Sequence, residues 1–135
     1  MKILVCDILN KQVLEELYKI GDCVDISTSL TKHEDLIKHI QDSEIVVIRS
    51  STNLTKEILK NAKKLIIIAR CGVGIDNIDI EFAKSQNIAV TNSPKANIIS
   101  VVELTVALII NASRKIGLAD KNVKDGKWDL SLIHI

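Results

Sequence analysis

The sequence has almost no excess of charge of either sign. It carries 18 Lys and Arg residues against 17 Asp and Glu residues, a formal net charge of +1. Proteins that bind nucleic acid or an anionic membrane surface present a basic patch, and this balance gives no such footprint. The composition therefore predicts no nucleic-acid partner and no membrane partner.

Cysteine, proline and aromatic residues are also scarce. The three cysteines, Cys6, Cys23 and Cys71, form no Cys-x-x-Cys pair, which argues against a disulfide framework and against a zinc site. Aromatic residues make up 2% of the chain, so its core must be aliphatic. The amino terminus has only a short apolar run before Asp7, unlike the apolar segment of a signal peptide, and this predicts a cytoplasmic protein.

Two of the five glycines, Gly72 and Gly74, directly follow an apolar run. A dinucleotide-binding loop needs a third glycine three positions after the second, and Asn77 stands there instead. The Gly-Val-Gly segment is therefore not a nucleotide phosphate loop. It either makes a tight turn or lets the backbone come close to a ligand.

Apolar runs rich in β-branched residues alternate with helical segments, which predicts an α/β fold with a doubly wound parallel sheet. Residues 45–48 and 65–68 are apolar at every position, the pattern of strands covered on both faces. Residues 21–27 alternate and suit an edge strand. The four other strands are expected within residues 2–7, 44–50, 63–71 and 87–92. Helices are expected after an N-cap at Asn10, after a capping box of Thr31 and Glu34, and across residues 55–63 and 80–86.

After Pro94, the only proline, the pattern changes to one long helix over residues 99–115. Ser100 and Glu103 form a capping box that predicts a helix start near residue 101, with residues 95–97 in the preceding loop. This helix is apolar around most of its circumference and should be buried by another surface. It is shorter than the about 20 apolar residues of a membrane span and carries charged side chains.

The loops at the carboxyl ends of parallel strands form the usual ligand site of such a sheet. Arg49 and Ser50, after the third strand, offer a guanidinium and a hydroxyl to a carboxylate or phosphate. Backbone N–H groups of Val73 and Gly74 could bind an anion directly, and Asn97 adds an amide near a helix N-terminus. These loops predict a site for a small anion.

Each candidate has a structural alternative. Arg49 could pair with a surface carboxylate, and Arg70, nearer the strand body, is expected to be a structural salt-bridge partner. Cys71 is expected to be a small buried residue rather than a reactive thiol. Asp76 is expected to form a turn and Asp79 to cap a helix. The histidines receive no catalytic role: His33, His39 and His134.

The linked motifs 69–79 (ARCGVGIDNID) and 91–103 (TNSPKANIISVVE), within residues 48–116, resemble the D-isomer-specific 2-hydroxyacid dehydrogenases, and within that family the phosphoglycerate-type enzymes of serine biosynthesis. The resemblance continues through 124–128 (KDGKW). It implies a two-domain enzyme that uses NAD to oxidise a small anionic 2-hydroxy acid such as 3-phosphoglycerate, as a homo-oligomer. Residues 1–95 would form the first segment of a flavodoxin-like substrate domain and 96–120 a hinge helix leading to a Rossmann domain.

The resemblance also assigns individual residues. Arg49 and Ser50 would contact the substrate phosphate or carboxylate. Val73 and Gly74 would donate backbone hydrogen bonds to the carboxylate, with Val73 also near the nicotinamide of NAD. Asn97 would orient the carboxylate. No residue is assigned as catalytic or as a metal ligand.

The family pattern continues into a cofactor domain with a GxGxxG loop and an Arg, a Glu and a His for catalysis, whereas residues 121–135 form a tail without these groups. We therefore expect a truncated dehydrogenase that is inactive alone. The alternative is a non-catalytic fragment that pairs with full-length dehydrogenase subunits through the apolar helix. A receiver-like signalling domain is disfavoured, because Arg49 and Asn92 stand where its Asp and Lys should be.

Overall fold

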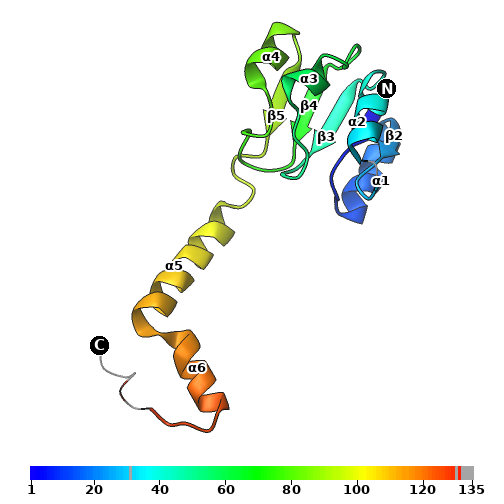
Figure 1. Cartoon of the computed structure of the whole chain (residues 1–135). Coiled ribbons are helices and arrows are strands. Elements are labelled where there is room, and N and C mark those ends of the chain that lie inside the picture. The colour runs from blue at the N-terminus through cyan, green and yellow to red at the C-terminus, as the bar shows by residue number, and fades with distance from the viewer. Residues whose placement is uncertain (31, 130, 132–135) are drawn as a thin grey trace. The chain divides into compact units, whose positions relative to one another are not determined.

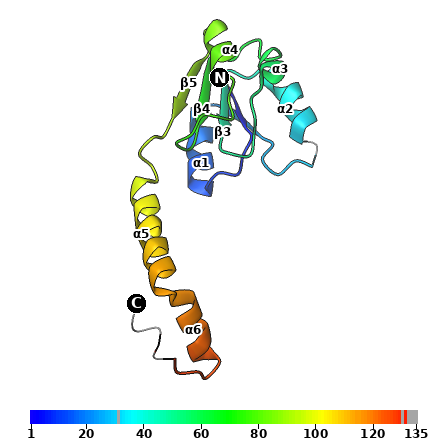
Figure 2. The same ribbon diagram turned by 60° about the vertical axis from the view of Figure 1, so that its left-hand side comes forward.

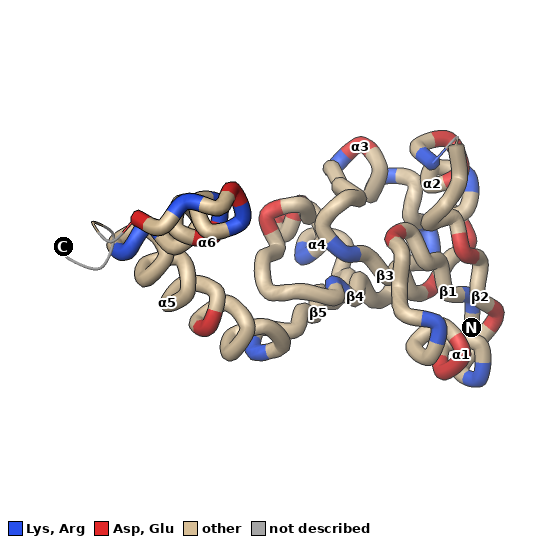
Figure 3. Tube along the Cα trace, turned by 90° about the horizontal axis from the view of Figure 1, so that it is seen from below, with Lys and Arg blue, Asp and Glu red and all other residues tan. Residues whose placement is uncertain are grey.

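The computed structural model describes residues 1–30, 32–129 and 131, and the chain divides into two compact units, Met1–Ala96 and Asn97–Ile135 (Figure 1). The predicted cap at Thr31 lies outside the described residues, and so does His134, to which no role was assigned. Basic and acidic residues are interspersed along the trace of the first unit (Figure 3), in keeping with the balanced composition.

The first unit contains a five-stranded parallel sheet in the order β2-β1-β3-β4-β5. The predicted α/β fold is confirmed, and β2 lies at an edge as its alternating sequence indicated. Ile48 pairs with Arg70 and Arg70 with Asn92, so the carboxyl ends of three strands are level. The strands are β1 Lys2–Val5, β2 Asp22–Asp25, β3 Ile45–Ile48, β4 Ile67–Arg70 and β5 Ala89–Asn92.

Helices cover both faces of this sheet (Figure 2). They are α1 Lys11–Ile20, α2 Lys32–Ile40, α3 Lys56–Leu59 and α4 Ile80–Ser85. Two predicted caps are confirmed, because Asn10 Oδ1 accepts the N–H of Gln12 at 2.9 Å and Asp79 Oδ1 accepts that of Phe82 at 2.9 Å. Helix α3 is shorter than predicted, since the chain turns at Asn61, whose carbonyl accepts the N–H of Lys63 at 3.0 Å.

The core is aliphatic, as the scarcity of aromatic residues required. On one face, strand residues such as Val46, Ile48 and Ile68 pack with side chains of α2, α3 and α4. On the other, Val5 and Val47 pack against α1. Because the central strands bury both faces, their sequences are apolar at nearly every position.

The second unit contains α5 Ile98–Arg114 and α6 Ile116–Lys124. The predicted start near residue 101 is wrong, because Asn97 is the N-cap and Ser100 lies in the first turn. The long helix predicted over residues 99–115 corresponds to α5. Lys115 adopts a left-handed conformation with φ 52°, and the Asn111 side chain accepts the N–H of Gly117 at 2.9 Å, which ends the first helix.

No residue of α5 is buried, and apolar side chains such as Ile99 and Ile109 are exposed. The described residues therefore do not bury this apolar helix, contrary to the expectation. Within those residues, no helix combines the length and the apolar character needed to traverse a lipid bilayer.

Candidate functional site

A cavity of about 300 Å³ lies at the carboxyl ends of β1, β2 and β3. The Arg49 guanidinium and the Ser50 hydroxyl suit a small anion, whereas Lys32 and the Ser51 hydroxyl are bonded to the Asp7 carboxylate in the same lining. Two residues predicted for the site, Arg49 and Ser50, line it, whereas Val73, Gly74 and Asn97 do not. The lining residues are Asp7, Ile8, Ser27, Lys32, Arg49, Ser50 and Ser51.

The side chains of Arg49 and Ser50 make few hydrogen bonds. Arg49 Nη1 donates one hydrogen bond of 3.3 Å to the carbonyl of Ile8, and no ion pair of Arg49 occurs within the described part of the chain. The alternative that Arg49 pairs with a surface carboxylate is therefore not seen. The Ser50 hydroxyl is exposed and has no hydrogen-bond partner among residues 1–30, 32–129 and 131. Both groups can meet an incoming anion without first breaking a strong bond.

The loop after β4 presents two backbone donors. In the described ranges, neither the Val73 nor the Gly74 N–H has an acceptor, while the Val73 carbonyl accepts the Asn92 side-chain amide at 2.7 Å. The C=O and N–H of a trans peptide point in opposite directions. Fixing the Val73 carbonyl against Asn92 therefore aims the Gly74 N–H away from β5. The loop is further held by the Ser93 N–H, which bonds the Gly72 carbonyl at 2.9 Å.

Arg70 lies beside this loop, and its predicted salt bridge is wrong. It makes no ion pair with any described residue, and its buried Nε has no acceptor there. A Cβ on Gly72 would clash with Nη1 and stand 3.0 Å from Cζ, so Gly72 leaves space that the guanidinium occupies. A Cβ on Gly74 would instead meet Oδ1 of Asp76 at 2.7 Å, with Nη2 of Arg70 at 3.9 Å. Arg70 is thus a further candidate donor beside this loop, and an arginine two residues before a Gly-x-Gly segment was its signal in the sequence.

The cysteines nearest the site differ in exposure. Cys71 is exposed, so the prediction of a buried position is wrong; it lies one residue beyond the end of β4, where the sheet no longer covers it. Cys6 is buried, and desolvation together with the neighbouring Asp7 carboxylate raises the pKa of its thiol to about 12. Cys6 therefore stays protonated and unreactive at neutral pH.

Asp7 is a site residue that sequence reasoning missed. Its side chain is 2% exposed, yet it accepts five hydrogen bonds. Lys32 Nζ and the Arg49 N–H each lie at 2.6 Å, the hydroxyls of Thr52 and Ser51 at 2.8 and 2.9 Å, and the Thr52 N–H at 3.3 Å. The carboxylate therefore gathers the loop 49–52 under the cavity. A lone Asp after a buried strand was the available signal.

Asp7 makes the stability depend on pH. Burial alone would raise the pKa of its carboxyl, but hydrogen bonds from Lys32, Arg49 and Thr52 lower it from 3.8 to about 2. A depressed carboxyl pKa stabilises the fold above the unfolded value and loses that contribution as the pH falls. We expect about 2.5 kcal/mol of unfolding free energy to disappear progressively between about pH 5 and pH 1.

Urea unfolding measured from pH 2 to pH 6 checks this expectation. Other carboxylates titrate in the same range, so the informative quantity is the difference between the wild type and Asp7→Asn. That difference should shrink by about 2 kcal/mol between pH 6 and pH 2. Parallel curves for the two proteins would contradict the assignment of the acid sensitivity to Asp7.

The remaining predicted site residue, Asn97, belongs to the second unit. Its carbonyl accepts the N–H of Val101 at 2.9 Å, and its side chain makes no capping hydrogen bond. Its contact with a substrate carboxylate stays a prediction. Across the described residues, no three His, Cys, Asp or Glu side chains gather as a metal ion would require.

Comparison with known proteins gives the family. The family described as D-isomer specific 2-hydroxyacid dehydrogenase, catalytic domain, matches residues 3–124. The chain belongs to this family. It is 43% identical over 129 residues to D-3-phosphoglycerate dehydrogenase of Methanocaldococcus jannaschii and 38% identical over 128 residues to that of Homo sapiens. The matches cover 96% and 95% of the chain but only 24% of either relative, so the chain spans about a quarter of their length.

Solved structures of related dehydrogenases and reductases share the fold. A Pyrococcus horikoshii protein superposes with a TM-score of 0.78 at 36% identity, over 95% of this chain and 38% of its own. The NAD⁺-bound 3-phosphoglycerate dehydrogenase of Entamoeba histolytica gives 0.68 at 32% identity, over 85% and 40%. An acyclic imino acid reductase in complex with NADPH and D-Arg gives 0.85 at 26% identity, over 96% and 43%. The chain thus corresponds to a part of each of these 2-hydroxyacid dehydrogenase-like structures.

Proposed function

We propose that this chain forms the substrate-binding part of an NAD-dependent D-2-hydroxyacid dehydrogenase of the 3-phosphoglycerate type. The observation that carries the proposal is the pair of backbone donors at Val73 and Gly74, which have no acceptor among the described residues and lie beside Arg70. Arg49 and Ser50 follow the neighbouring strand at the same edge of the sheet. A substrate with one anionic group at each end fits two such donor loops.

The two loops would divide the substrate between them. The carboxylate would accept the N–H groups of Val73 and Gly74, with Arg70 supplying positive charge and Asn97 orienting it. The phosphate would meet Arg49 and Ser50, because a guanidinium binds phosphate oxygens in pairs. Support for a phosphorylated substrate also comes from the relatives, which are named for phosphoglycerate.

The NAD cofactor would take up hydride from the hydroxy acid when bound. The described residues of this chain offer only one contact to NAD. None of the five glycines stands in GxGxxG spacing, so the sequence has no loop for the cofactor phosphates. The contact we propose is between the side chain of Val73, which is 40% exposed, and the nicotinamide. The role of the described residues is to bind and orient the substrate. We expect the 135-residue chain to bind substrate without turnover, since hydride transfer also needs a positioned nicotinamide.

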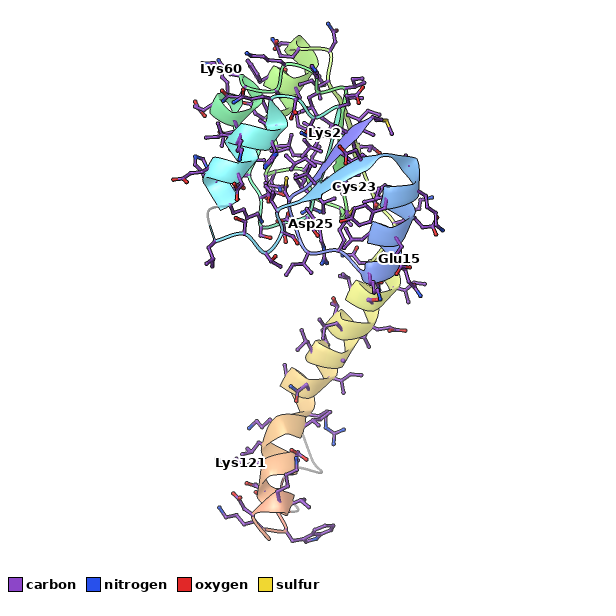
Figure 4. All side chains as sticks on the ribbon, turned by 90° about the vertical axis from the view of Figure 1, so that its right-hand side faces the viewer. Lys2, Glu15, Cys23, Asp25, Lys60 and Lys121 are labelled. Atoms are coloured by element: carbon purple, nitrogen blue, oxygen red, sulfur yellow. The ribbon has the colours of Figure 1, made fainter. Side chains whose placement is uncertain are left out.

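A titration followed by amide NMR tests the proposal. The chain is titrated separately with 3-phosphoglycerate, D-glycerate and inorganic phosphate. We expect the Val73 and Gly74 amide signals to shift with the two carboxylates, and the Arg49 and Ser50 signals with 3-phosphoglycerate and phosphate. The control is Lys60→Gln, an exposed cation after α3 (Figure 4), which should leave all affinities unchanged. Absence of any shift at these four amides would sink the proposal.

A further inference from the structure

One side chain bridges the two donor loops. Asn77, in the loop after β4, donates from Nδ2 to the carbonyl of Arg49 at 2.8 Å and to that of Thr52 at 2.6 Å. Both partners are acceptors, so the orientation of the amide is unambiguous. The Asn77 backbone is tied to the same segment, because its carbonyl accepts the N–H of Leu54 at 2.8 Å. Asn77 therefore holds the start and the end of loop 49–52.

Asp7 holds the backbone N–H groups of the same loop. Its carboxylate accepts the N–H groups of Arg49 and Thr52, whereas Asn77 donates to the carbonyls of the same two residues. Donors and acceptors of the loop backbone are thus fixed by different elements. Asp7 belongs to the segment after β1 and is independent of the loop after β4. The Asn77 side chain joins the Arg49 loop to the Val73 loop, and a backbone bridge between Leu54 and Ile78 lies next to it.

We infer that Asn77 is a positioning residue that sets the spacing between the phosphate and carboxylate contacts, and thereby favours substrates that carry both anions, such as 3-phosphoglycerate, over ligands that carry one. The inference rests on the proposed function. A ligand that spans two loops gains affinity only when both are held at the matching distance, whereas a ligand that occupies one loop is indifferent to that distance. Asn77 acts through Arg49 and the Val73 loop and does not touch the substrate.

Only the donor side of the Asn77 amide is used. Asn77 Oδ1 is buried and has no donor among the described residues, whereas Nδ2 donates to two carbonyls. Those two bonds support the fold as well as the position of loop 49–52. The two donated bonds are what the amide provides, and both act on the loop that carries Arg49.

The test is Asn77→Leu, which keeps a similar shape and removes the donor without adding a negative charge beside the anion contacts. We expect 3-phosphoglycerate to bind at least about tenfold more weakly, while inorganic phosphate and D-glycerate change by less than about twofold. The matched control is Asn61→Leu, because the Asn61 amide donates to the Glu57 carbonyl at 2.8 Å away from both loops. A loss shared equally by all three ligands, or no loss, would overturn the inference.

Hydrogen exchange provides a readout that needs no ligand. In Asn77→Leu, and in Asn77→Ser should the first variant fold poorly, the Leu54 amide, which bonds the Asn77 carbonyl at 2.8 Å, should exchange at least about tenfold faster, with the Ile68 amide in β4 unchanged. Unaltered exchange at Leu54 would refute the bridge. If the wild type binds none of the three ligands, the proposed function fails, and the exchange rates still decide whether Asn77 holds the loop.

Discussion

Replacing Asp7 with alanine should lower the free energy of unfolding by about 3 kcal/mol, the largest stability change we expect from a single polar residue here. The carboxylate is 2% exposed and accepts two backbone N–H groups, two hydroxyls and the Lys32 ammonium. Alanine would leave these donors without an acceptor. The side chain of Lys32 is 29% exposed and can turn towards water in the variant. The expected loss of unfolding free energy is therefore at the lower end of the range for a broken buried ion pair. Urea denaturation at pH 7 measures it.

The matched control is Asp25→Ala on the edge strand β2 (Figure 4). Asp25 also ends a strand and accepts one backbone N–H, from Ser27 at 2.8 Å, but it is exposed. Its replacement should change the unfolding free energy by less than about 1 kcal/mol. A similar small effect for Asp7→Ala would mean that the buried network does not stabilise the loop 49–52.

Much of the fold follows from local patterns in the sequence. Strands β3 and β4 are apolar at consecutive positions because both faces of the central sheet are covered, and β2 alternates because it lies at an edge. The helix starts at Asn10 and Asp79 are readable because a capping side chain bonds an N–H only two or three residues away. These signals act over a few residues, so a single sequence contains them.

The chemistry of the candidate site depends on contacts that are distant in the sequence. Asp7 meets Arg49 across 42 residues, and Asn77 meets the same residue across 28. No spacing rule predicts such contacts, because the register of the parallel strands creates them. The predicted start of α5 was wrong for a different reason: Ser100 and Glu103 imitate a capping box inside a helix whose N-cap is already Asn97.

Arg70→Met should weaken binding of 3-phosphoglycerate and of D-glycerate by about 10- to 100-fold, because it removes a charged donor beside the Val73 and Gly74 amides. The same change should leave the unfolding free energy within about 1 kcal/mol of the wild type or raise it slightly. The buried Nε has no acceptor among the described residues, so the fold gains little from it. Calorimetric titration and urea denaturation of one preparation measure both effects.

Gly72→Ala distinguishes a role of the Arg70 charge from a general disturbance of the loop. The new Cβ would clash with the end of the Arg70 side chain, which is flexible and can move away with little loss of stability. Affinity for the carboxylate ligands should then fall although Arg70 is still present. In the Arg70→Met background the alanine should have little further effect, because the group that it displaces is already gone. Independent, additive losses would instead mean that the Gly72 backbone, and not the position of the guanidinium, limits anion binding.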